Sequence, residues 1–166
     1  MKSLVVYSTR TGNTRLTAEA IAEGLRAGGT AEVRAVTDDP ATLPNDLDVL
    51  VVGGPTEGHG MPEPIASFLD RLPEGACTGR AAAAFDTRLQ WPRWLSGSAA
   101  DGIRQRLERA GAGLPVPTES FAVTMKPELV PGELDRARAW GAALAASLAA
   151  AEAAAMTQNS IRGTSR

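Results

Sequence analysis

Short apolar runs alternate along the chain with longer segments in which apolar residues recur every three or four positions. Continuous apolar stretches at residues 4–7, 49–52 and 81–85 have the pattern of strands covered on both faces, and weaker strand patterns occur at 31–36 and 121–125. Between the strand patterns at 4–7 and 31–36, one face of a predicted helix carries Ala18, Ile21, Ala22 and Leu25. Five strands that alternate with helices predict an α/β fold built on a parallel sheet.

Residues that start or stop helices bound the predicted helical segments. The glycine pair at 28–29 ends the first helix, and Pro62 and Pro73 bracket a second one. Ser98, followed three residues later by Asp101, predicts the N-cap of a third helix that ends at Gly111. The last helix covers residues 134–148 and is rich in alanine, the residue with the highest helix propensity.

A chain of 166 residues predicts one domain, which we place at residues 1–150. Residues 151–166 are polar toward the end, with little to bury, and predict a frayed tail. No apolar run approaches the roughly 20 residues that cross a bilayer, so membrane insertion is not expected. The apolar core of the first ten residues is too short for a signal peptide, which predicts a cytoplasmic protein.

Charge and reactive residues exclude several classes of function. The formal net charge of -2 gives no overall basic field for nucleic acid. Cys77 is the single cysteine, so no intrachain disulfide can form, and we expect a bystander thiol. With one histidine and no Ser/His/Asp spacing, hydrolytic chemistry is unsupported, and the chain lacks metal-ligand clusters.

The segment STRTGNT at residues 8–14 lies between a predicted buried strand and a predicted helix. This position places backbone N–H groups at a helix N-terminus, where an anion is stabilised. Gly12 permits a tight turn, and the surrounding hydroxyls add short donors. The Walker and GxGxxG patterns are absent, so the loop suits a terminal phosphomonoester better than a triphosphate or pyrophosphate. The alternative is a polar cap and turn that binds nothing.

Three motifs resemble the flavodoxin family. The sequence TRTGNT at residues 9–14 matches the phosphate-loop pattern of the family, T/S-x-T-G-N-T. DVLVVGGPTEGHGMPEPIASFLDRL at residues 48–72 is similar to the third strand, flavin loop and following helix of the family. AAAAFDTRLQWPRW at residues 81–94 is similar to the fourth strand and the second flavin-flanking loop. The segment between the last strand and the last helix has no long insertion, which resembles the short-chain branch.

This resemblance implies a doubly wound fold with strand order 2-1-3-4-5, helices on both faces of the sheet, and flavin mononucleotide (FMN) at the carboxyl ends of the strands. The phosphate would lie in residues 9–14, and the isoalloxazine ring between residues 55–60 and 86–91. An indole covers a flavin with a large apolar area, so Trp91 is the expected stacking residue. The residues implied in FMN binding are Ser8, Thr9, Arg10, Thr11, Gly12, Asn13, Thr14, Pro55, Thr56, Glu57, Gly58, His59, Gly60, Asp86, Thr87, Arg88 and Trp91.

The chain departs from the family pattern beside the proposed ring. Glu57 stands where flavodoxins often have an aromatic residue or methionine, so one flavin face is either open or covered by Met61. Gly58 matches the position whose peptide turns over to offer a carbonyl to the reduced flavin, and His59 follows it. Trp94 is expected to pack on the next helix.

Three functions follow from these residues. The first is an electron carrier that cycles through the flavin semiquinone and hydroquinone and acts with protein redox partners. The near-neutral charge, with arginines beside the site, does not predict the acidic docking ring of many flavodoxins. The second is an FMN-dependent oxidoreductase acting on a quinone-type small molecule, or one like a protoporphyrinogen oxidase, whose family shares an STRxGxT opening. The third is a flavin-free binding module of the same fold.

Overall fold

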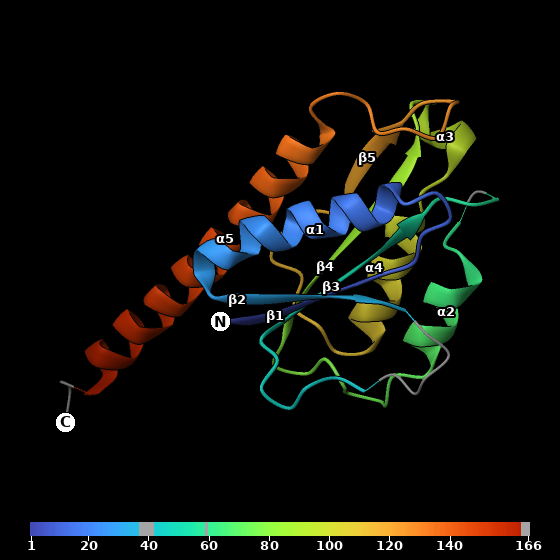
Figure 1. Cartoon of the computed structure of the whole chain (residues 1–166). Coiled ribbons are helices and arrows are strands. Elements are labelled where there is room, and N and C mark those ends of the chain that lie inside the picture. Colours follow the sequence, from blue (N-terminus) through green and yellow to red (C-terminus); the bar gives the residue numbers. More distant parts are fainter. Residues whose placement is uncertain (37–41, 59, 164–166) are drawn as a thin grey trace.

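A computed structural model describes residues 1–36, 42–58 and 60–163 of the chain. Five strands form one sheet in the order β2-β1-β3-β4-β5, and every neighbouring pair is parallel (Figure 1). The strands are β1 Lys2–Tyr7, β2 Thr30–Ala35, β3 Val49–Pro55, β4 Ala81–Leu89 and β5 Glu119–Val123. The predicted α/β class and strand order are therefore confirmed.

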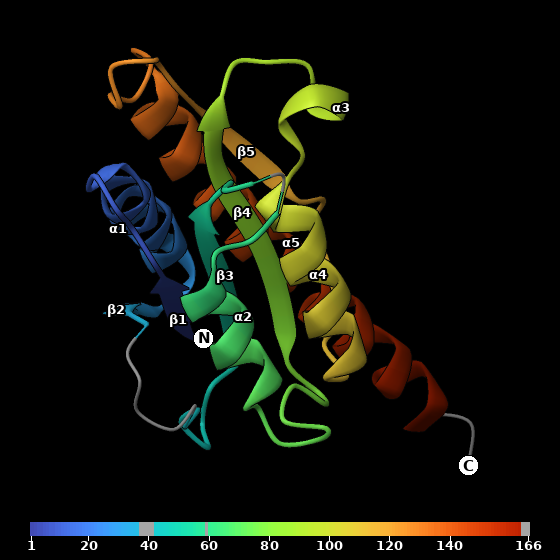
Figure 2. The same cartoon turned by 90° about the vertical axis from the view of Figure 1, so that its right-hand side faces the viewer.

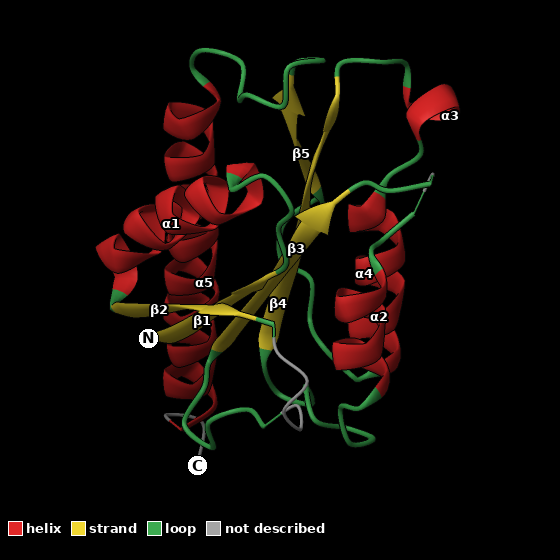
Figure 3. Cartoon of the chain, turned by 45° about the vertical axis from the view of Figure 1, so that its right-hand side comes forward, coloured by secondary structure: helices red, strands yellow, loops and turns green. Residues whose placement is uncertain are grey.

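Helices cover both faces of the sheet, as predicted. Figure 3 shows three layers, with α1 and α5 on one side of the strands and α2 and α4 on the other, and Figure 2 views the α2/α4 side. The α-helices are α1 Asn13–Leu25, α2 Glu63–Asp70, α3 Arg93–Ser96, α4 Ala99–Arg109 and α5 Glu133–Gly163, with a 3₁₀ turn, η1, at Arg26–Gly28. The predicted N-cap of α4 is confirmed, because Ser98 Oγ accepts from the Asp101 N–H at 3.3 Å.

The strands are apolar on both faces because each face packs on a helical layer. Leu4 and Val6 of β1 belong to the core cluster under α2 and α4, whereas Val5 belongs to the cluster under α1 and α5. The same alternation continues through β3, where Leu50 and Val51 divide between the two clusters. Two-sided burial explains why these strands appear in the sequence as continuous apolar runs.

The register of the strands brings several of their carboxyl ends together at one edge of the sheet. β3 and β4 pair from Val49↔Ala81 to Pro55↔Thr87, whereas β5 pairs only with the second half of β4, starting at Phe85↔Glu119. The carboxyl ends of β3, β4 and β5 therefore lie together. In doubly wound sheets ligands bind outside this edge, where the strand order reverses.

Two glycines allow α1 to cross α5 at short range. A Cβ atom at Gly24 would overlap the carbonyl oxygen of Arg138, and one at Gly141 would overlap the carbonyl oxygen of Ile21. Any larger side chain would separate the helices, so this contact fixes where the N-terminus of α1 lies relative to the sheet.

The chain end differs from the sequence prediction. The polar composition predicts a frayed tail from residue 151, but α5 continues to Gly163 and extends beyond the sheet (Figure 1). The alanine-rich sequence around residue 151 extends the helix, because alanine has the highest helix propensity. Residues 149–159 are all exposed, so this part of the helix buries little, as the composition indicated.

The same helix also corrects the expectation about apolar length. Glu133–Asn159 is long and apolar enough, by length and composition, to cross a membrane, and it is the one such helix in the described residues. Much of the hydropathy of this helix comes from alanine, a residue that also has a high helix propensity. Ala137, Leu144 and Ala145 of this helix are buried in the protein, where they face the α1 side of the sheet.

Candidate functional site

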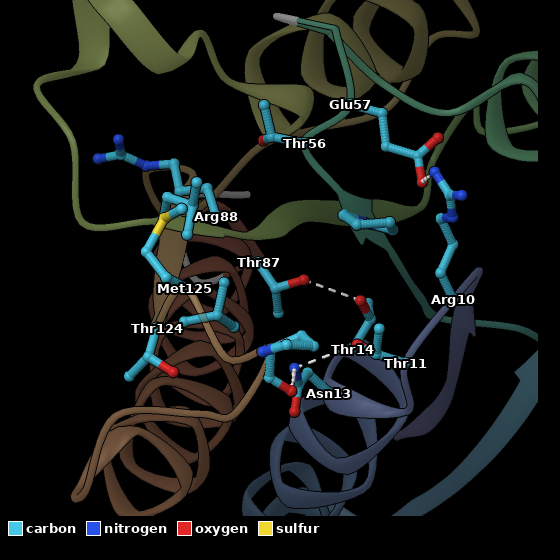
Figure 4. A pocket seen from close by; sticks show the side chains of 14 residues that line it. Arg10, Thr11, Asn13, Thr14, Thr56, Glu57, Thr87, Arg88, Thr124 and Met125 are labelled. Carbon is cyan, nitrogen blue, oxygen red and sulfur yellow. Dashed lines mark hydrogen bonds and ion pairs between the residues drawn. The ribbon is translucent and has the colours of Figure 1, made fainter.

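A pocket of about 430 Å³ lies at the carboxyl edge of the sheet, within the size range of small-molecule sites (Figure 4). Three loops border it: the loop after β1 (residues 8–12), the loop after β3 (described at residues 56–58 and 60–62) and the loop after β5 (residues 124–132). Its lining residues are Arg10, Thr11, Asn13, Thr14, Pro55, Thr56, Glu57, Thr87, Arg88, Leu89, Val123, Thr124, Met125 and Pro127.

The N-terminus of α1 opens onto this pocket. Gly12 is the N-cap residue, with φ +92°, in the left-handed region that glycine adopts at little cost. Among the described residues no side chain caps this terminus, and the first turn holds no acidic residue. The first N–H groups of the helix therefore keep their hydrogen-bonding capacity and the positive end of the helix dipole for an anion.

Hydrogen bonds hold the loop after β1 and the start of α1 in place. Thr9 Oγ1 accepts from the Gly12 N–H at 3.0 Å, and the hydroxyls of Thr14 and Thr87 lie 2.8 Å apart, pointing toward one another in Figure 4. Asn13 Nδ2 donates to the Pro127 carbonyl at 2.7 Å. The last bond ties α1 to the loop after β5, so two walls of the pocket are joined.

The loop after β3 forms a tight turn on the opposite side of the pocket. The Thr56 N–H donates to the Thr87 carbonyl at 2.9 Å, and Glu57 and Gly60 exchange two backbone hydrogen bonds of 2.9 Å. Gly58, at the tip, has φ +51°. Arg10 Nη1 approaches Glu57 Oε1 to 3.5 Å across the pocket mouth. Because the arginine side chain is 78% exposed, this ion pair is weak.

The segment after β4 carries the residues expected to flank a ring. Arg88 Nη1 donates to the Trp91 carbonyl at 3.0 Å and to Ser96 Oγ at 2.8 Å, which ties this segment together. Trp91 is 47% exposed and lies outside the pocket lining. Trp94 is 84% exposed, so the expected packing of Trp94 on the next helix is wrong.

Met61, the alternative cover expected for the ring, lies outside the pocket lining. It is partly buried and packs against the core cluster under α2 and α4, where its Cε lies against Gly102. Gly102 has no Cβ, and the flexible thioether of Met61 occupies the space that a Cβ there would take.

Asp86 also lies away from the pocket lining. Its side chain is fully buried on the α4 side of the sheet, where Oδ2 accepts from Ser98 Oγ and the Ala100 N–H. Successive strand residues face opposite sides of a sheet, so Asp86 and the pocket-lining Thr87 point in opposite directions. The sequence pattern could not indicate which of the two faces the pocket.

The structure brings nine of the implied residues into the pocket lining: Arg10, Thr11, Asn13, Thr14, Pro55, Thr56, Glu57, Thr87 and Arg88. The predicted residues outside the lining are Ser8, Thr9, Gly12, Gly58, Gly60, Asp86 and Trp91. Of these, Thr9 and Gly12 shape the loop after β1 through their hydrogen bond. His59 lies outside the described residues.

The sequence motifs did not indicate the pocket wall at the end of β5. Val123, Thr124, Met125 and Pro127 line the pocket, but none belongs to the motifs that resemble a known family. A usable signal was present, because the loop after the last strand of a parallel sheet opens at the same edge as the other carboxyl ends. The short polar segment after residue 125 could have been assigned to the pocket on that ground.

Cys77 is fully buried in the core cluster under α2 and α4. Burial raises the pKa of its thiol, which disfavours the reactive thiolate. Its position outside the pocket lining fits the bystander role expected from the sequence.

The fold and pocket define a doubly wound α/β protein with a pocket at the N-terminus of its first helix. Residues 5–90 match the model of the family described as flavodoxin. The chain is 39% identical over 95 residues to a flavodoxin of Aquifex aeolicus, covering 54% of this chain and 51% of that protein. It is 31% identical over 149 residues to a flavodoxin of Maridesulfovibrio salexigens, covering 87% and 97%. The chain belongs to the flavodoxin family, a family of FMN-binding redox proteins.

The chain is also similar to a quinone dehydrogenase and to solved flavodoxin structures. An NAD(P)H dehydrogenase (quinone) of Acidovorax ebreus is 32% identical over 112 residues, covering 51% of this chain and 54% of that protein. The structure of oxidised flavodoxin 1 from Bacillus cereus superposes with a TM-score of 0.71 at 26% identity, covering 86% and 95%. Matches to the Aquifex and Acidovorax proteins span about half the length of each relative.

The residues present fit FMN. The uncapped helix terminus with Thr11 and Thr14 beside it provides neutral donors for a phosphate. Gly12 leaves the approach open, since a Cβ added there would meet no described atom within 4 Å. The apolar wall of Leu89 and Val123 suits the uncharged part of the cofactor.

Proposed function

We propose that this protein is an FMN-dependent electron carrier that exchanges electrons with protein redox partners. The observation that supports it most strongly is the uncapped N-terminus of α1, which opens onto the pocket beside the hydroxyls of Thr11 and Thr14. Together with the flavodoxin family, this arrangement favours the carrier over the flavin-free binding module.

The loop after β1 and the first turn of α1 hold the phosphate in this proposal. The N–H groups of Asn13 and Thr14 and the hydroxyl of Thr11 donate to it without a full positive charge. Thr87 holds the Thr14 hydroxyl at the pocket floor before the ligand arrives. This preformed geometry reduces the ordering cost of binding.

The loop after β3 and the segment after β4 flank the ring. FMN, when bound, supplies the reversible acceptance of electrons. Glu57 places a carboxylate at the pocket, which opposes additional negative charge, whereas Arg10 partly offsets it through the ion pair at 3.5 Å. Trp91 remains the proposed stacking residue, which requires its indole to move toward the pocket from its half-exposed position.

A second candidate function is the reduction of a quinone-type substrate on the flavin. It is favoured by the similarity to the Acidovorax NAD(P)H dehydrogenase (quinone). It is also favoured by Glu57, because a carboxylate at this position cannot stack on the ring as an apolar side chain would. A substrate could stack on the uncovered face of the ring. For either function we propose a cytoplasmic location, with partner proteins that need not be strongly basic because the chain is nearly neutral.

Anaerobic reduction of the FMN-loaded protein distinguishes the two functions. We expect an absorbance spectrum that changes in two separate one-electron stages during stepwise reduction with dithionite, and no rapid turnover of quinones with NADH or NADPH. Rapid bleaching by a nicotinamide donor followed by reoxidation with a quinone would favour the second function. If the folded apoprotein does not bind FMN, both proposals are wrong.

A further inference from the structure

The carboxyl end of β4 carries two buried polar residues that face opposite layers of the protein. Thr87 contacts Thr14 of α1 on the pocket side, and Asp86 lies on the α4 side. Both residues also contact Thr56, since the Thr56 N–H donates to the Thr87 carbonyl and the Thr56 hydroxyl donates to Asp86. The end of β4 therefore connects both sides of the pocket.

Asp86 gathers its hydrogen bonds on a single carboxyl oxygen. Oδ2 accepts from Thr56 Oγ1 at 3.1 Å, from Ser98 Oγ at 2.8 Å and from the Ala100 N–H at 3.0 Å. Thr56 Oγ1 in turn accepts from the Ala99 N–H at 3.0 Å. The base of the loop after β3 is thus joined to the start of α4 by two routes.

The other oxygen of Asp86 is a buried polar atom without a hydrogen bond among the described residues. A buried acceptor without a hydrogen bond lowers the stability of the folded protein. Capping of α4 does not require this cost, because Ser98 already accepts from the Asp101 N–H. The bond to Thr56 is the contact of Asp86 that reaches the pocket lining.

We propose that Asp86 is a positioning residue, which fixes the loop after β3 against the flavin ring by holding Thr56. This inference rests on the proposed binding of FMN. Thr56 directly precedes the turn formed by Glu57 and Gly60, so the orientation of Thr56 sets where that turn begins. Above this base the tip is open, because a Cβ added at Gly58 would meet no atom of the described residues within 4 Å.

The contacts predict that Asp86 acts at the ring end of the site and not at the phosphate end. The loop after β1 is held through Thr9, Asn13 and Thr14, whereas Asp86 hydrogen-bonds to Thr56, Ser98 and Ala100. Loss of the Asp86 side chain should therefore weaken riboflavin and FMN by the same factor, since both ligands share the ring.

The test measures the affinity of the apoprotein for riboflavin and FMN by quenching of flavin fluorescence, with inorganic phosphate as a competitor for the phosphate end. We expect Asp86→Ala and Thr56→Val each to weaken both flavins about tenfold, the effect of losing one to two hydrogen bonds, with phosphate competition unchanged. Thr56→Ser keeps the hydroxyl and should restore the affinity to within about threefold of wild type.

Ser98→Ala is the matched control, because it removes another hydrogen bond to the same Asp86 oxygen and leaves Thr56 in place. We expect it to lower the stability of the apoprotein to urea while changing riboflavin affinity less than about threefold. Should Asp86→Ala fail to fold, the pair Thr56→Val and Thr56→Ser carries the same comparison.

Three results would overturn the inference and leave the proposed function intact: unchanged riboflavin affinity in Asp86→Ala and Thr56→Val, a loss for FMN alone, or an equal loss in Ser98→Ala. Failure of Thr56→Ser to recover affinity would also contradict it, because the hydroxyl would then not be the group that matters. If wild-type protein binds neither FMN nor riboflavin, the proposed function itself is wrong and this inference falls with it.

Discussion

The two loops that face each other across the pocket are held in different ways. The loop after β1 and the start of α1 are bonded through side chains to β4 and to the loop after β5, by Thr14 to Thr87 and by Asn13 to Pro127. The loop after β3 is bonded at its base through Thr56, whereas glycines occupy its tip at positions 58 and 60. One side of the pocket is tied to other elements by several side chains, whereas the described part of the other side is held at Thr56 and by the two backbone hydrogen bonds between Glu57 and Gly60.

This difference matches the two tasks of the proposed site. A phosphate keeps the same charge and shape in every redox state, so a fixed set of donors can serve it throughout. The ring changes its charge and its hydrogen bonding when it is reduced, and a loop with room at its tip can follow that change. The following substitutions test the division, starting with the largest expected effect.

Replacement of both Thr11 and Thr14 by alanine should have the largest effect on FMN. Each hydroxyl contributes at most roughly 1.5–3 kcal/mol when it donates to a charged group, so we expect FMN affinity to fall on the order of 100-fold. Riboflavin lacks the phosphate and should lose less than about threefold. Titration of the apoprotein with both flavins measures this, and an equal loss for the two would contradict the phosphate assignment.

Asn13→Ala should weaken the preformed side more moderately. It removes the 2.7 Å bond to the Pro127 carbonyl at a buried position, so we expect the free energy of urea unfolding to fall by about 1–2 kcal/mol. FMN affinity should fall several-fold, because the wall formed by the loop after β5 loses its tie to α1. Glu19→Ala, an exposed change on the same helix, is the control and should stay within about 0.5 kcal/mol of wild type. A variant as stable as this control would show that the bond does not hold the wall.

Gly58→Ala tests the tip of the loop after β3. At φ +51° a Cβ atom strains the backbone, so we expect the apoprotein to lose about 1 kcal/mol of stability. Gly60→Ala in the same turn has open space at its Cβ and should cost less than about 0.5 kcal/mol. Urea denaturation of the two variants side by side measures the difference. Equal stability would indicate that the tip conformation imposes no requirement for glycine at position 58.

Glu57→Gln should have the smallest effect. The ion pair with Arg10 is 3.5 Å long and largely exposed, so its loss should change the stability of the apoprotein by less than about 0.5 kcal/mol. We expect a melting temperature close to that of wild type at both low and high salt. A clear drop at low salt that disappears at high salt would show that the pair closes the pocket mouth and that the ring side is less adjustable than proposed.

Local sequence signals determined much of the fold. Two-sided burial produces continuous apolar runs, so the strands at 4–7, 49–52 and 81–85 could be recognised without the structure. Helix caps act within a few residues, which is why Ser98 could be assigned from its neighbours alone. The strand order and the flavin loops came from motifs that resemble the flavodoxin family, and the matched family and the sheet confirm the family and the order.

Contacts between distant segments decided the rest. The burial of Asp86 against the start of α4, the exposure of Trp94 and the wall at Thr124 and Met125 depend on how strands and loops far apart in the chain meet. Periodicity carries no information about such meetings. The amino-acid sequence by itself determined most of the strands and helices and predicted a phosphate loop, because those properties arise within one or two turns of backbone. Only the tertiary structure decided which polar side chains face the pocket, because a strand offers two faces and the packing of the helical layers selects between them.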